Sequence, residues 1–165
     1  MPPELDQLKE ELRLAAIHKG HLLDVLGLFQ LLEFQLELVV KQIYQLADNS
    51  LRPTRFKHVG GRHQTLGSLI LEYEAHTDDD MFVSKLRELK ERRNELAHRE
   101  ALLLTSYNMV LVKRSAAKYA RVRKRLEPAI IRLVGESGEL KRRIEVAKAG
   151  RIKLAALTAL RRKRT

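Results

Sequence analysis

Four residues near the middle of the chain have side chains that together suit phosphodiester chemistry. They are the two adjacent arginines, the asparagine and the histidine of the segment ERRNELAHR, residues 91–99, which ends in a third arginine. A histidine that titrates near neutral pH can move protons, a guanidinium can hold a phosphate, and a carboxamide can orient either group. Arg93, Asn94 and His98 are therefore candidate catalytic residues.

The spacing of these residues supports two interpretations. On a regular α-helix Asn94 and His98 share a face, whereas Arg93 and His98 lie about 140° apart. An arginine side chain is long enough to span that arc, particularly where a helix ends. The segment also has the pattern of an exposed helix with charged neighbours four residues apart, such as Glu88 and Arg92. The residue types alone leave both interpretations open.

The composition indicates the class of fold that must position these residues. The chain of 165 residues fits one domain, and its hydrophobic content of 44% with only 8 glycines and 4 prolines favours helices. We therefore expect an all-α protein. Since there is no cysteine, disulfide bridges and cysteine-ligated metal sites are excluded, and a cytoplasmic location is expected. Every apolar run is broken by charge, which predicts no association with a membrane.

The charge is distributed unevenly along the chain. Residues 1–50 carry 4 basic and 8 acidic residues, a net charge of −4. Residues 51–165 therefore carry a net charge of +15, which gives the total of +11. The last 25 residues contain 10 basic residues and one acid, Glu145. Such a basic region attracts polyanions, most commonly nucleic acid, although a solvated tail has the same composition.

Apolar spacing and turn residues divide the chain into expected helices. Leucines and alanines three and four apart predict a helix over 4–18, interrupted by Gly20 and followed by a central, largely buried helix over 21–47. The segment 48–64 is rich in glycine, proline, asparagine and serine and is an expected loop.

Three further helices are expected after this loop. One begins near Thr65, and one begins after N-cap candidates at 77–80, with Phe82, Leu86, Leu89 and Leu96 on its inner face. The third runs over 101–126. Pro128 then marks a break or restart, and the GESG sequence at 135–138 marks a boundary before a basic C-terminal helix.

The hexapeptide RNELAH, residues 93–98, resembles the signature of the HEPN superfamily. These all-α proteins carry an arginine, four to six residues and a histidine, often with an asparagine directly after the arginine. The context is also similar, with a long apolar helix, a basic loop, a helix beginning TLGSLI, and the motif near the end of a helix. The resemblance covers about residues 20–126. It implies an antiparallel helical bundle at 1–134, with 135–165 as an additional basic helix or tail.

The resemblance implies a metal-independent endoribonuclease in which the 2′-OH of the RNA is the nucleophile. Carried over by position, Arg93 would hold the phosphate and His98 would transfer protons. Asn94 would orient either His98 or the phosphate. Arg92 also fits the permitted spacing. Many such proteins act as homodimers and as toxins or in antiviral defence, with an antitoxin or regulatory protein as partner. The toxin branch usually has a tyrosine two positions after the histidine, where this chain has Glu100.

A second class of function stays open, namely a noncatalytic helical dimer that binds nucleic acid or an acidic protein. We expect no cofactor and no metal, because His18, His21 and Asp24 lack a fourth ligand and no phosphate-binding loop or nucleophile elbow is present. For the ribonuclease the expected partner is RNA. The expected RNA-binding residues are Arg52, Arg55, Lys57, Arg62, Arg92, Arg99, Lys141, Arg142, Arg143, Arg161, Arg162, Lys163 and Arg164.

Overall fold

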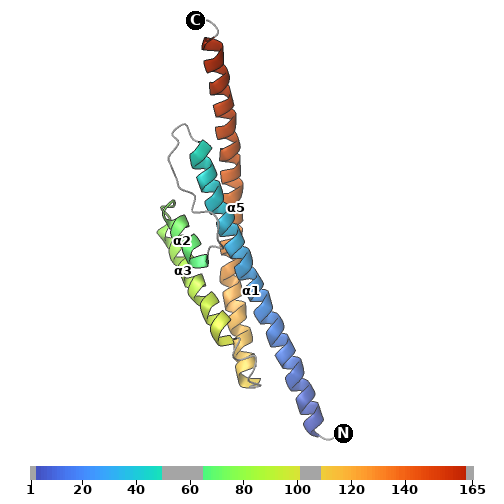
Figure 1. Cartoon of the computed structure of the whole chain (residues 1–165). Helices are drawn as coiled ribbons and strands as arrows, with labels where there is room; N and C mark the ends of the chain where they lie inside the picture. The colour runs from blue at the N-terminus through green and yellow to red at the C-terminus, as the bar shows by residue number, and fades with distance from the viewer. Residues whose placement is uncertain (1–2, 50–64, 101–108, 163–165) are drawn as a thin grey trace.

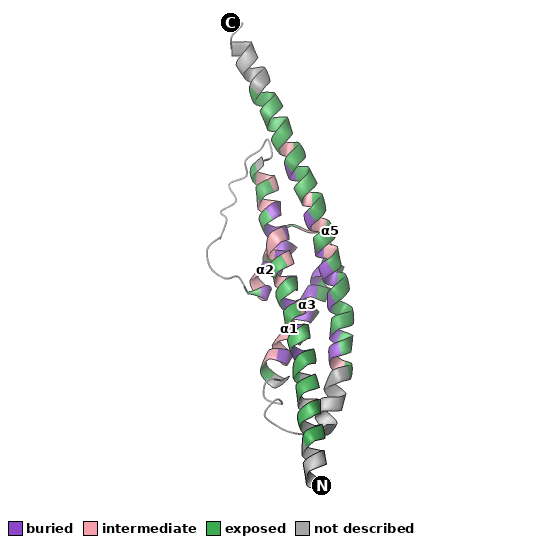
Figure 2. Ribbon diagram, turned by 90° about the vertical axis from the view of Figure 1, so that its right-hand side faces the viewer, coloured by how far each residue is buried: buried purple, intermediate pink, exposed green. Residues whose placement is uncertain are grey.

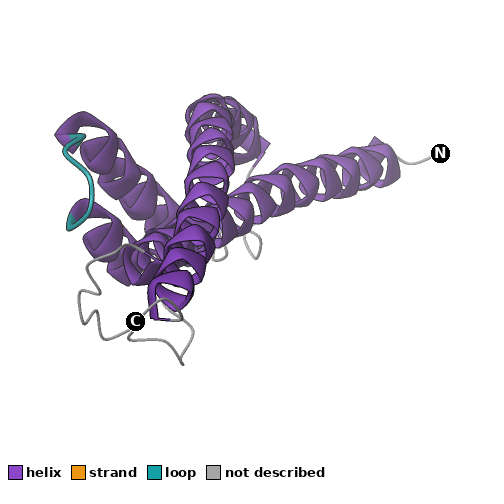
Figure 3. Cartoon of the chain, turned by 90° about the horizontal axis from the view of Figure 1, so that it is seen from above, coloured by secondary structure: helices purple, strands orange, loops and turns teal. Residues whose placement is uncertain are grey.

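The protein is all-α, as the composition predicts. The computed structural model describes residues 3–49, 65–100 and 109–162, and within these ranges every regular element is a helix (Figure 3). The elements are α1 (Pro3–Asn49), α2 (Leu66–Glu74), α3 (Asp80–Glu95), the short π-helix η1 (Leu96–Glu100) and α5 (Met109–Arg162).

The two long helices, α1 and α5, run side by side in the same direction, and α3 runs against them (Figure 1). The bundle thus has antiparallel neighbours, with α3 against α5, together with one parallel pair, α1 and α5. Since α1 and α5 are not consecutive along the chain, no short turn imposes opposite directions on them. With 47 and 54 residues and a rise of 1.5 Å per residue, they span about 70 and 80 Å. Both extend well beyond the shorter helices.

The first helix is continuous where the sequence predicts a break at Gly20. A glycine inside a helix costs about 1 kcal/mol relative to alanine, which is too little to end a helix that has strong helix formers on both sides. Leu22, Val25 and Phe29 are buried against the other helices, and this packing holds α1 in a single helix.

The ends of the short helices follow the predicted capping chemistry. Thr65 caps α2, because its Oγ1 accepts a hydrogen bond from the backbone N–H of Ser68 at 3.3 Å. Asp79 caps α3 in the same way, accepting from the backbone N–H of Phe82 at 2.9 Å. Both N-caps lie where the sequence predicts helix starts.

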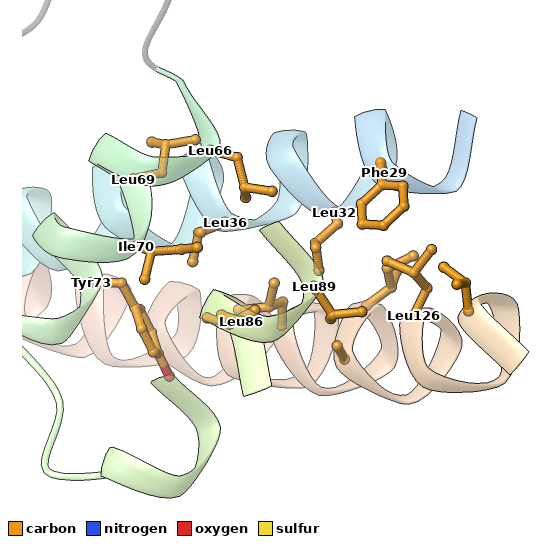
Figure 4. Close-up of a cluster of buried hydrophobic side chains, with 14 of the residues drawn as sticks. Phe29, Leu32, Leu36, Leu66, Leu69, Ile70, Tyr73, Leu86, Leu89 and Leu126 are labelled. Atoms are coloured by element: carbon orange, nitrogen blue, oxygen red, sulfur yellow. The ribbon is translucent and has the colours of Figure 1, made fainter. Parts of the chain in front are cut away.

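One contiguous core joins all the helices. From α1 it takes residues spaced three and four apart, including Leu22, Val25, Phe29, Leu32 and Leu36. These meet side chains of α2, α3 and α5 (Figure 4). The predicted inner face of α3 is confirmed, since its four members are all buried: Phe82, Leu86, Leu89 and Leu96. Burial of each such side chain stabilises the fold by about 1.5–3 kcal/mol.

The last helix is also continuous, so the breaks predicted at Pro128 and at 135–138 are absent. Proline removes one backbone hydrogen bond, but Pro128 lies on an exposed side of α5, where water can reach the carbonyl left unpaired. Leu133 before the predicted boundary and Ile144 beyond it are both buried. The helical unit therefore does not end at residue 134.

Beyond this core both long helices continue as exposed arms (Figure 2). No described side chain before Leu22 is buried, and none is buried after Ile144 in the part of α5 whose side chains are described. None of the described helices combines the length and the apolar character needed to cross a membrane.

Candidate nucleic-acid interface

The candidate motif lies where α3 changes into a π-helix. The α-helix ends at Glu95, and Leu96–Glu100 continue with wider π-helical turns, which occur frequently at functional sites. Leu96 is buried in the core and fixes this segment, whereas His98 two residues later is exposed. The side chain of His98 is thus presented to solvent from a fixed backbone.

Arg92 and Arg93 contact different partners. The Nη2 atom of Arg93 lies 3.4 Å from Oε1 of Glu33 on α1. The Nη1 atom of Arg92 instead lies 3.0 Å from Oε2 of Glu95, on the side where α5 packs. Glu95 is also 3.9 Å from Nζ of Lys118 on α5.

The three candidate catalytic residues are close in the chain but do not form a hydrogen-bonded site. Asn94 is half-buried, and Arg93 is held by Glu33. No hydrogen bond recorded between described residues joins Arg93 to His98. The motif therefore offers an exposed imidazole and a nearby guanidinium that must leave its carboxylate before it can bind a phosphate.

A basic groove runs between α3 and α5. It consists of two adjoining hollows of about 510 and 500 Å³ that share Leu89, Lys124 and Arg125. Its floor is apolar, with Phe82, Leu89, Val122 and Ala129. We define the basic groove by its seven cationic residues, which are Lys85, Arg92, Lys118, Arg121, Lys124, Arg125 and Arg132.

Acidic residues neutralise only part of this charge. Glu88 pairs with Arg125, and Glu95 pairs with Arg92 and Lys118. For Arg121 and Lys124, by contrast, no ion pair or hydrogen bond to another described residue is recorded, and both are exposed. The groove thus keeps two exposed cations on one helix of its rim.

A polar cluster fixes one end of the groove. The Arg132 guanidinium lies 3.9 Å from the ring centroid of Phe82, and its Nη2 is 2.6 Å from Oδ2 of Asp79. The N–H of Phe82 and then Arg132 hold the pKa of Asp79 below its usual value. Arg132 is therefore engaged in holding the start of α3 to α5.

The buried tyrosine Tyr73 belongs to the same cluster. Its hydroxyl donates to the Glu136 carboxylate on α5, with both oxygens at 2.8 Å. Burial and then this carboxylate raise the pKa of Tyr73 to about 12. The hydrogen bond from Tyr73 to Glu136 thus joins α2 to α5.

Several predicted RNA-binding residues lie away from this groove. Lys141, Arg142 and Arg143 are exposed further along α5, and Nη2 of Arg142 lies 2.6 Å from Oε2 of Glu139. Arg99 lies in η1 and two more lie at the end of α5, but their side chains are outside the described part: Arg161 and Arg162. Six others fall outside the described residues altogether, namely Arg52, Arg55, Lys57, Arg62, Lys163 and Arg164.

Of the predicted residues whose side chains are described, only Arg92 lies in the basic groove. The α5 side of the groove was not predicted, although a signal for it is present in KYARVRKR, residues 118–125. Lys118, Arg121 and Arg125 are spaced three and four apart, which places them on one face, while Val122 and Leu126 occupy the buried face. Because basic residues are common throughout the C-terminal half, this helical spacing does not stand out in the sequence.

Among the described residues, no group of three histidine, aspartate or glutamate side chains is arranged to hold a metal ion. Comparisons of the chain with protein-family models, with curated proteins and with solved structures found no significant match. The function of the protein is therefore inferred from the basic groove and the motif.

Proposed function

We propose that this protein binds single-stranded RNA along the basic groove between α3 and α5. The observation that supports the proposal is the pair of exposed cations, Arg121 and Lys124, on the rim of a hollow that is otherwise lined by cations and apolar side chains. A strand of phosphates passing along the groove would release counterions from these side chains.

The composition of the groove indicates how such binding would depend on conditions. Its aromatic residue, Phe82, is buried beneath Arg132, so it offers no open ring on which a base could stack. Contacts would therefore be made mainly with phosphates. We expect weak sequence preference and a strong dependence on salt concentration.

Charge reversal in the groove tests this proposal. The variant Arg121→Glu/Lys124→Glu should weaken binding of a short single-stranded RNA. The slope of log affinity against log salt should fall by about 0.7 for each lost phosphate contact. The matched control, Lys19→Glu/Lys41→Glu, makes the same change in net charge on exposed positions of α1. Equal affinities of the two variants would contradict the proposal.

The same assay separates other polyanions from RNA. Single-stranded DNA of the same sequence and poly-glutamate are measured in parallel. If poly-glutamate binds as tightly as RNA and competes with it, the groove serves an acidic protein partner and the RNA proposal is wrong.

As a second candidate we propose that the protein cleaves the RNA it binds, as a metal-independent HEPN-type endoribonuclease. The specific observation in favour is the exposed His98, held on a π-helical turn directly after Arg93 and Asn94. In this reaction the 2′-OH attacks the adjacent phosphorus while its proton leaves to a base, and the 5′-oxygen departs with a proton from an acid. His98 would serve in proton transfer, and Arg93 or Arg92 would hold the phosphate. If the protein is such an endoribonuclease, we expect it to act as a toxin or in antiviral defence, with an antitoxin or regulatory protein as its partner.

Incubation with RNA in the presence of EDTA tests the candidate. His98→Ala should lower the cleavage rate by about 10²–10⁴-fold while RNA binding is retained. His21→Ala, a change at an exposed histidine on α1, is the matched control and should cleave as wild type does. Absence of cleavage by the wild-type protein, or equal rates for the two variants, would remove this candidate and leave binding alone.

A further inference from the structure

The side of α1 that faces away from the core carries a second apolar stripe. We call it the outer stripe, and it consists of Leu12, Ala16, Gly20, Leu23, Gly27, Leu31 and Phe34, all of which are exposed. Its large members expose about half of their surface, from 42% for Leu31 to 59% for Phe34. The apolar residues over 21–47 predicted a central, largely buried helix, because Leu23, Leu31 and Phe34 add to the apolar residues of the core face.

The spacing of the outer stripe is regular. Successive members are four, four and three residues apart, and the pattern repeats after eleven residues, so that Leu12, Leu23 and Phe34 are equivalent positions. Eleven residues in three turns average about 3.67 residues per turn, close to the 3.6 of a straight helix. The stripe therefore stays on one side of α1 over about 33 Å. The core residues, such as Phe29 and Leu32, occupy the opposite side.

The total surface of the chain is larger than a compact monomer would expose. The accessible surface is 12289 Å², whereas a folded monomer of 19.1 kDa is expected to expose about 8,400 Å². Obligate dimer interfaces bury about 2,000–5,000 Å² in total, or about 1,000–2,500 Å² of each chain, so the excess of about 3,900 Å² per chain is large enough to contain one such interface. Exposed apolar patches of this length mark interaction sites.

We propose that the outer stripe is the interface with a second copy of this chain, formed by α1 packing on α1. The same straight stripe is present on each copy, which is what a two-fold interface requires. Nothing lies within 4 Å of a Cβ added at Gly20 or Gly27, so a second helix can approach the backbone there. Because the stripe points away from the core, the pairing leaves both basic grooves open. Homodimerisation was expected only from the resemblance, and this surface is assigned independently of RNA binding.

The mass in solution and two substitutions test the interface. Wild type should elute with twice the mass of 19.1 kDa in size-exclusion chromatography with light scattering. Leu23→Glu/Phe34→Glu should elute as a monomer with unchanged helical circular dichroism. The matched control is Leu71→Glu/Val146→Glu, which places the same charges at equally exposed apolar positions of α2 and α5 and should remain dimeric. A monomeric wild type, or association that survives the outer-stripe variant, overturns the proposal.

Cysteine cross-linking keeps the test decisive if the double variant fails to fold. Because the chain has no cysteine, single changes at Leu23→Cys, Gly27→Cys and Leu31→Cys introduce the only thiols. Under oxidation at least one of the three should form a covalent dimer, since a two-fold axis brings some position of the stripe close to its own copy. Val146→Cys is the control and should stay monomeric under denaturing conditions. If none of the three stripe variants forms a covalent dimer, the interface does not lie on this face.

Discussion

At the scale of single residues, the two arginines of the motif differ in which carboxylate they contact. Arg93 reaches Glu33 on α1, and Arg92 reaches Glu95 beside α5. Their order in the sequence could not distinguish them, because both fit the spacing to His98. The structure places only Arg92 in the basic groove, so a strand bound there would meet Arg92 first. Arg93 would contribute only after separating from Glu33.

Releasing Arg93 distinguishes the two roles. Glu33→Gln removes the charge that holds Arg93 while keeping the size of the side chain. If Arg93 binds the phosphate, RNA affinity should rise by up to about fivefold, since a partly exposed ion pair is worth about 0.2–1 kcal/mol. Affinity is measured by titration at constant salt. The variant Glu33→Gln/Arg93→Ala should lose the gain, and a gain that persists without Arg93 would show that the effect is general electrostatics.

Tyr73 gives a second prediction at this scale. Replacing it by phenylalanine removes the hydrogen bond to Glu136 and should lower the free energy of unfolding by about 1–2 kcal/mol at neutral pH. The folded state raises the pKa of Tyr73 from 10.0 to about 12. The stabilisation is therefore fully present below pH 10 and is lost as the pH rises to 12.

Denaturant unfolding of wild type and Tyr73→Phe across this range measures the effect. The difference in unfolding free energy between the two proteins should shrink as the pH rises from 10 to 12. The comparison cancels the titration of lysines, which are common to both proteins. A difference that stays constant with pH would mean that the phenol does not titrate with a raised pKa.

At the scale of elements, the sequence predicted the starts of the short helices well but also predicted breaks inside the long helices that are absent. Thr65 and Asp79 act through hydrogen bonds within three residues, so their effect is visible in the local sequence. Gly20, Pro128 and the glycines near 135–138 are also local signals, but packing over several turns of α1 and α5 outweighs them. The π-helical turn at Leu96 has no local signal, because it depends on burial of Leu96 against other helices.

Two glycines of α5 allow a test of whether this helix is continuous. Nothing lies within 4 Å of a Cβ added at Gly135 or Gly138, and both lie inside a continuous helix. Each change to alanine should therefore raise the free energy of unfolding by about 0.5–1 kcal/mol. Thermal or denaturant unfolding checks the result. If either alanine destabilises the protein, the chain bends at 135–138 as the sequence suggested and α5 is not a single helix.

At the scale of the whole molecule, composition predicted the all-α class and the charge imbalance, but not the relative direction of the helices. Direction depends on which apolar faces meet, and α1 has two such faces, so its pattern alone does not say which one the rest of the chain covers. The charge of the C-terminal half likewise does not say which cations are neutralised by Glu88 or Glu95. Those pairings join residues far apart in the sequence.

The last prediction concerns the exposed arm of α5 and where it begins. Deleting residues 139–165 would remove Ile144, which is buried at 4% exposure. Loss of a buried isoleucine typically costs about 2–5 kcal/mol, so this deletion should destabilise the fold. Deleting only 150–165 removes six basic residues and no acid, and no described side chain in this segment is buried.

The shorter deletion therefore separates charge from folding. It should leave the thermal unfolding temperature unchanged, while the salt slope of RNA binding falls by about 0.7 for each phosphate contact that the arm makes. The Arg121→Glu/Lys124→Glu change should lower the slope further in the shortened protein, because the groove and the arm act at separate places on the strand. If the slope does not change after the deletion, the arm does not touch RNA. If the unfolding temperature falls, the arm belongs to the folded unit, and the boundary of that unit lies beyond residue 150.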